Sequence, residues 1–206
     1  MSKVWVRNAS YEEGLLDGLI PEAIASVHPG LVSRGDRVLI KPNFLLPARP
    51  DQAVLTHPSV VRAVTRYVLD QGGQPLIADS SAFGSFDRLA KQGGYASALA
   101  DLDVAFAPFE ASVEVDIGDP FGRIELARAA MEADKVINLP KLKTHSQMVL
   151  TLAVKNLFGT VVGWRKPQWH LKAGVSRQTF AQLLGGICLA VSPAVTIMDG
   201  ILALEG

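Results

Sequence analysis

Cysteine and long apolar runs are both scarce in this 206-residue sequence. Cys188 is its single cysteine, so the chain by itself can form neither an internal disulfide nor an iron–sulfur cluster or other cysteine-built metal cluster. No apolar run has the length of a transmembrane helix, and the N-terminus lacks the apolar core of a signal peptide. With 49% hydrophobic and 19% charged residues, the composition predicts a cytoplasmic globular protein with no membrane partner.

Several short catalytic motifs are also missing. The sequence contains no GxSxG elbow, no P-loop, no GxGxxG fingerprint and no HExxH pair. Serine hydrolysis, ordinary nucleoside triphosphate hydrolysis and simple dinucleotide binding therefore lack their usual signatures here.

Acidic residues are absent from a long stretch of a chain whose formal charges cancel. Residues 135–198 contain eight lysines and arginines and no acid, net +8, whereas residues 1–134 contain 18 acids and 12 bases, net −6. Asp199 and Glu205 then restore neutrality. Because a solvated surface normally mixes both signs, this asymmetry predicts that the basic stretch binds an anion. The alternative is that its bases are buried and pair with acids of the first 134 residues.

Short apolar runs alternate with helical patterns along the chain. Strands are predicted over residues 36–43, 74–81, 102–108, 134–141 and 194–200, with a weaker candidate over 4–9. Helices are predicted over 57–73 and 176–192, with two short helices within 85–102. This order predicts a single α/β domain over residues 1–206, with a mainly parallel, doubly wound, Rossmann-like sheet covered by helices on both faces. A Gly118-Asp119-Pro120 turn predicts an antiparallel hairpin near residues 110–127, which would make the sheet mixed.

Polar residues follow several of the predicted strands. In open α/β sheets ligands bind beyond the carboxyl ends of the strands, so we expect these residues to gather at one rim. They are Lys41, Asn43, Asp79, Ser80, Asn138, Lys141, Lys143, Thr144, His145 and Asp199.

The segment after this rim places a lysine among apolar residues. Thr151, Lys155 and Gly159 fall at i, i+4 and i+8, which predicts one stripe of a helix over residues 151–159. Lys155 either extends to water or points at a partner, and a buried ammonium would have a lowered pKa suited to a base or a Schiff-base nucleophile. Gly159 would let the backbone approach a ligand closely. Residues 164–170 are interpreted as an exposed loop.

These observations give one set of candidate site residues. The predicted catalytic residues are Lys155, His145, Asp79 and Asp199. The predicted substrate-binding residues are Lys41, Asn43, Ser80, Lys141, Lys143, Thr144, Asn156, Gly159, Lys166 and His170. The alternative is a transition metal bound by His145 and His170 together with Asp79 or Asp199. The spacing of the two histidines matches no metal motif, so no metal ligand is assigned.

The blocks "VLIKPNF", "DKVINLPKLKTH", "TLAVKNLFGTVVG" and "IMDGILALEG" together resemble domain-of-unknown-function family 362. The resemblance runs from about residue 36 to the last residue. It implies a link to redox chemistry, because many relatives carry ferredoxin-like cysteine motifs and are described as iron–sulfur proteins. Relatives usually continue past the last block, so the resemblance also implies either a chain truncated at its C-terminus or a shortened member of the family.

Three function classes fit these features. The first is an enzyme, possibly redox-linked, that binds a small anionic substrate and takes electrons from a ferredoxin-like partner or a bound cofactor. The second is a non-catalytic anion-binding or partner-docking module. The third, a nucleic-acid strand stacked on Trp164 and Trp169, is disfavoured by the zero net charge.

Overall fold

The computed structural model describes residues 3–80, 85–145, 148–163, 165–174 and 176–205. Its centre is a five-stranded sheet in the order β3-β2-β1-β6-β9, and every pair of neighbouring strands is parallel. The strands are β1 (Arg37–Pro42), β2 (Gln74–Asp79), β3 (Ala105–Pro108), β6 (Lys135–Leu139) and β9 (Val195–Thr196). Near-continuous burial along β1 and β6 matches strands that are covered on both faces.

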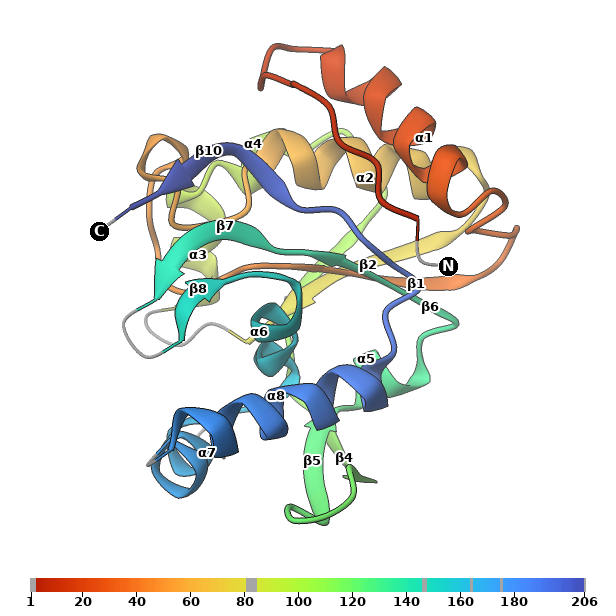
Figure 1. Ribbon diagram of the computed structural model, residues 1–206. Helices are drawn as coiled ribbons and strands as arrows, with labels where there is room; N and C mark the ends of the chain where they lie inside the picture. The colour runs from red at the N-terminus through yellow and green to blue at the C-terminus, as the bar shows by residue number, and fades with distance from the viewer. Residues whose placement is uncertain (1–2, 81–84, 146–147, 164, 175, 206) are drawn as a thin grey trace.

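Helices cover both faces of this sheet (Figure 1). One layer contains α1 (Leu15–Val27), α2 (Pro58–Asp70), α3 (Phe86–Gln92) and α4 (Tyr95–Ala98). The other contains α5 (Arg128–Glu132), α6 (Ala153–Leu157), α7 (Arg165–Ala173) and α8 (Arg177–Val191). Two short 3-10 helices, η1 (Pro50–Gln52) and η2 (Phe158–Thr160), complete the helical elements of the described residues.

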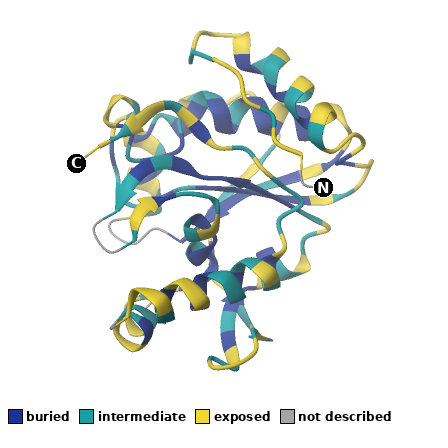
Figure 2. Ribbon diagram, in the orientation of Figure 1, coloured by how far each residue is buried: buried dark blue, intermediate teal, exposed yellow. Residues whose placement is uncertain are grey.

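Each layer buries its own apolar core against the sheet. Val38 and Ile40 of β1 belong to the core under α1 and α2, whereas Leu39 belongs to the core under α6 and α8. Side chains alternate along a strand, so Lys41 is on the same face as Leu39 and enters the α6–α8 layer. Figure 2 shows the buried strands of the central sheet between the two helical layers, of which α2 is itself largely buried.

The strand order reverses between β1 and β6. The chain moves from β1 outward to β3, then returns to place β6 on the other side of β1. Lys41 pairs in register with Asn138, and Pro42 with Leu139, at the carboxyl ends of these two strands. In doubly wound sheets this switch point is where ligands bind.

Two smaller sheets accompany the central one. A three-stranded sheet has the order β10-β7-β8, built from β7 (Lys141–His145), β8 (Val149–Thr151) and β10 (Asp199–Leu204). In Figure 1, β7 continues the path of β6 out of the central sheet. The antiparallel pair of β4 (Ser112–Asp116) and β5 (Arg123–Ala127) forms the predicted hairpin as a separate sheet.

The mainly parallel α/β fold predicted from the sequence is confirmed, with several local corrections. The central sheet is not mixed, because the hairpin stays outside it. Residues 4–9 form no strand. The predicted strand over 134–141 ends before Pro140, which lacks the N–H donor of a ladder position, and β7 begins in another sheet. The predicted strand over 194–200 is likewise divided between β9 and β10.

The segment that follows β7 also differs from its prediction. The helix predicted over residues 151–159 is limited to α6, and Thr151 belongs to β8. The loop predicted over 164–170 is the first part of α7, because Pro167 lies in the first helical turn, where proline is tolerated. Trp164 lies outside the described residues. Among the helices that the structure describes, none combines the length and apolar character needed to cross a membrane.

Candidate functional site

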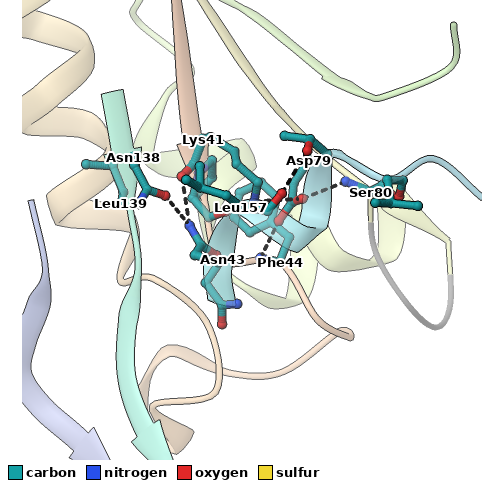
Figure 3. Close-up of polar contacts among 12 residues, drawn as sticks. Lys41, Asn43, Phe44, Asp79, Ser80, Asn138, Leu139 and Leu157 are labelled. Carbon is teal, nitrogen blue, oxygen red and sulfur yellow. Dashed lines mark hydrogen bonds and ion pairs between the residues drawn. The ribbon is translucent and has the colours of Figure 1, made fainter. Parts of the chain in front are cut away.

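A buried ion pair lies at the switch point. Lys41 Nζ is 2.9 Å from Asp79 Oδ1, and both side chains are almost fully excluded from water. The backbone N–H of Phe44 donates to Asp79 Oδ2, and that of Ser80 to Oδ1 (Figure 3). Burial lowers the pKa of Lys41, and the adjacent Asp79 carboxylate partly offsets that effect. The carboxylate of Asp79 is therefore already committed to one lysine and two backbone donors.

Gly159 packs directly against this pair. A Cβ atom at residue 159 would lie 2.3 Å from Asp79 Oδ1 and 2.5 Å from Lys41 Nζ. The glycine predicted as a ligand contact thus has a packing reason of its own, since no side chain fits between η2 and the ion pair.

Two asparagines connect α6 to the central strands. Asn156 Nδ2 donates to Asn138 Oδ1 at 2.8 Å and to the carbonyl oxygen of Lys41 at 3.2 Å. Asn138 Nδ2 donates in turn to the carbonyl oxygen of Ala153. These bonds fix α6 beside β1 and β6 (Figure 3), so Asn156 positions the helix that carries Lys155.

Three further lysines come together beside the ion pair; we call Lys143, Lys155 and Lys166 the lysine cluster. Lys143 extends from β7 and donates to the carbonyl oxygen of Val54 at 2.8 Å, while Lys166 extends from α7 and donates to that of Ser80. Lys155, on α6, lies over aromatic rings instead. The ring centres of Phe158 and Phe180 are 4.7 Å and 5.5 Å from its Nζ.

The lysine cluster carries charge that no nearby carboxylate cancels. Burial lowers the pKa of each of its three lysines to about 8. The charges of Lys41 and of other cluster members lower the pKa of Lys155 further, and no carboxylate raises it. For Lys143 and Lys166, Asp79 is the one acid with an opposing influence. The site is thus a positively charged group of side chains contributed by β7, α6 and α7.

Two histidines border the lysine cluster. Burial and the charges of Lys155 and Lys143 lower the pKa of His145, whose Nδ1 accepts a hydrogen bond from Met148 N–H. Burial lowers the pKa of His170 to about 4, and its ring packs against Phe158 and Phe180. Both rings are therefore neutral near pH 7. In the described part of the chain, no three metal-ligating side chains of His, Cys, Asp or Glu gather in one place.

A second buried polar group lies next to the first. Lys141 Nζ forms an ion pair with Asp199 Oδ2 at 2.9 Å, and the Tyr11 hydroxyl donates to Oδ1 at 2.6 Å. The ring of Tyr11 stacks on His57 with centroids 3.6 Å apart. Asp199 thus neutralises Lys141 rather than facing the lysine cluster. The sequence analysis missed Tyr11, because it lies in an irregular segment with no periodic pattern.

Strand geometry divides the remaining predicted residues. Lys141, Lys143 and His145 alternate along β7 and share one face, so Thr144 lies on the opposite face. Asn43 is half-buried, and its backbone N–H donates to the Thr56 hydroxyl.

An open concavity of about 600 Å³ lies beside the Tyr11–His57 stack rather than at the lysine cluster. It is also lined by Arg49, Pro50, Asp51, Gln92 and Leu202.

The alternative explanation for the basic stretch is met only in part. Arg165 pairs with Glu125 of β5 at 2.6 Å, but its side chain is 43% exposed. Lys141 is buried and paired, but its partner Asp199 lies outside the first 134 residues. The lysine cluster has no such partner in the described ranges.

Comparison with known protein families shows the family to which this chain belongs. Residues 38–206 match the family described as "Domain of unknown function (DUF362)". This chain belongs to the DUF362 family.

One curated DUF362-like relative matches almost the whole chain. The thylakoid-associated protein sll1697 of Synechocystis sp. (strain ATCC 27184 / PCC 6803 / Kazusa) is 41% identical over 203 residues, which cover 98% of this chain and 63% of that protein. The DUF362 chain described here thus spans less than two thirds of that relative. Among solved structures, the lactate racemase apoprotein from Thermoanaerobacterium thermosaccharolyticum matches 89% of this chain and 48% of its own, with a TM-score of 0.47 and 13% identity.

Proposed function

We propose that this DUF362 chain binds a small carboxylate or phosphate anion at the lysine cluster and forms the substrate-binding part of an enzyme. The observation that carries the proposal is the uncompensated charge of Lys143, Lys155 and Lys166 at the switch point of the sheet. A buried cation without a counterion is unfavourable, and a bound anion removes that penalty.

The enzymatic part of the proposal rests on Lys155. With a pKa of about 8, Lys155 is mostly protonated near pH 7, but a larger fraction of it is neutral than for an ordinary lysine, as a general base or a nucleophile requires. His145 is the second proton-transfer candidate, because its lowered pKa keeps the ring neutral. A redox reaction would draw its electrons from a ferredoxin-like partner or another bound cofactor, since the sequence holds a single cysteine.

Anion binding is tested by calorimetric titration of phosphate and citrate at pH 7. Wild-type protein is expected to bind, whereas Lys143→Gln and Lys155→Gln each lose about tenfold in affinity, the effect of roughly 1.4 kcal/mol. Lys172→Gln is the control, because Lys172 lies on α7 with Lys166 of the cluster but is exposed to solvent. Failure of both anions to bind, or equal binding by all variants, would refute the proposal.

The role of Lys155 is tested by its rate of acylation as a function of pH, followed by mass spectrometry of the labelled peptide. We expect a midpoint near pH 8 and protection by bound anion. A midpoint near the ordinary lysine value of about 10.4 would remove the acid–base role and leave a non-catalytic binding module.

We also propose the cytoplasm as the location of this chain, as its composition predicts. The Synechocystis relative is named for its association with thylakoids, and that association is a property of the relative. Cell fractionation tests the location: sedimentation of this protein with membranes, resistant to a salt wash, would contradict it.

A further inference from the structure

The side-chain charges around the lysine cluster can be counted. All acidic and basic side chains of the sequence belong to described residues, so no side-chain counterion is left out of the count. Lys41 is balanced by Asp79, Lys141 by Asp199, and Arg165 by Glu125. His145 and His170 are neutral near pH 7. Three positive charges remain when the lysine cluster is fully protonated.

The hydrogen-bonding capacity of the lysine cluster is also largely unused. An ammonium group has three N–H donors, and Lys143 and Lys166 each donate one hydrogen bond to a backbone carbonyl oxygen. The ammonium group of Lys155 donates to no acceptor among the described residues. Thr151 pairs in register with Lys143 across β7 and β8, so both side chains are on the same face. Among the described residues, nothing bonds to the buried Oγ1 of Thr151.

The lysine cluster is largely buried rather than exposed to solvent. Lys143 is only 6% exposed, and Lys155 and Lys166 are partly buried. A phosphodiester backbone or an acidic protein surface could not reach all three ammonium groups at once, whereas a compact molecule could. Buried charges also act on one another more strongly than exposed ones, so each uncancelled charge matters.

We propose, building on the anion-binding function above, that the ligand is a compact trianion, such as a tricarboxylate or a phosphorylated carboxylate, with one negative charge for each lysine of the cluster. Lys143 binds it from β7, Lys166 from α7 and Lys155 from α6, and the hydroxyl of Thr151 donates to one of its oxygens. A monoanion would leave two positive charges uncancelled, and a dianion would leave one.

The inference is tested with a series of acids that share a carbon skeleton. Tricarballylate, glutarate and butyrate are titrated at equal ionic strength and pH 7; phosphoenolpyruvate and pyrophosphate then show whether phosphate can supply the charges. We expect each added charge to raise affinity at least about tenfold, because it contacts a desolvated ammonium group. Titration at pH 8 in two buffers of different ionisation enthalpy should show an uptake of about one to two protons with the trianion.

The controls separate this inference from the proposed function. Lys155→Arg keeps the charge and should keep the preference for trianions, whereas Lys155→Met should bind di- and trianions alike; Lys172→Gln should match wild type. Equal affinity for all three acids, with binding still dependent on Lys143, would overturn the trianion inference and leave the anion site. Loss of every lysine-dependent signal would overturn both.

Discussion

Replacement of Lys155 by methionine should stabilise the protein. Lys155 has a pKa of about 8 instead of 10.5, and each unit corresponds to about 1.36 kcal/mol, so its charge raises the free energy of the folded state by about 3 kcal/mol near pH 7. Cation–π contacts with the rings of Phe158 and Phe180 offset about 1 kcal/mol of this cost. After allowance for partial solvent screening, the Lys155→Met variant should gain about 1–2 kcal/mol in the free energy of unfolding.

The gain should depend on pH with a defined sign. Below about pH 8 Lys155 is charged in both folded and unfolded protein, and the full penalty acts on wild type. Between about pH 8 and pH 10.5 the folded state loses the proton first, so wild-type stability rises relative to the variant. Above that range the amine is neutral in both states and the difference disappears.

Urea denaturation followed by far-ultraviolet circular dichroism measures this difference at about pH 6.5, 8 and 10. Lys172→Met serves as the control, because a substitution of an exposed lysine should stay within about 0.5 kcal/mol of wild type. A Lys155→Met protein that is less stable than wild type at pH 6.5, or whose advantage is unchanged at pH 10, would refute the reasoning.

Three other substitutions test the surrounding network, each by the same denaturation assay with about 0.5 kcal/mol as the threshold for an effect. Gly159→Ala should destabilise by about 2–4 kcal/mol, because the added methyl group overlaps Asp79 and Lys41; Gly185→Ala, where space is open and φ is not positive, should cost less. Asp79→Asn should cost about 3–5 kcal/mol by leaving Lys41 buried without its counterion. Tyr11→Phe should cost about 1–3 kcal/mol through its lost bond to Asp199.

Much of the fold could be predicted because its signals are local. Continuous apolar runs identified β1, β2, β3 and β6, and helical patterns over 57–73 and within 85–102 identified α2, α3 and α4. The division at Pro140 was harder, because residues 134–145 are extended throughout and only their hydrogen-bond partners change. Periodicity gives the conformation of a segment but not the sheet that it joins.

The part of the candidate site that could be predicted is the part set by the parallel strands of the central sheet. Lys41 and Asp79 could be placed together because both end parallel strands of one sheet. Asp199 could not be assigned to Lys141, since that pairing depends on β10 returning beside β7. The position of Lys166 also required tertiary structure, because residues 165–173 form a helix that turns this lysine toward Ser80.

The contrast between paired and unpaired cations is the strongest argument for a ligand. Where a buried base serves the fold, this chain supplies a carboxylate: Asp79 for Lys41 and Asp199 for Lys141. Lys143 and Lys155 lie close to those same elements, but neither forms an ion pair with a carboxylate of the described residues. A fold that needed only packing there would be more stable with apolar side chains. The charge is therefore better explained by a molecule that binds to it than by the stability of the protein itself.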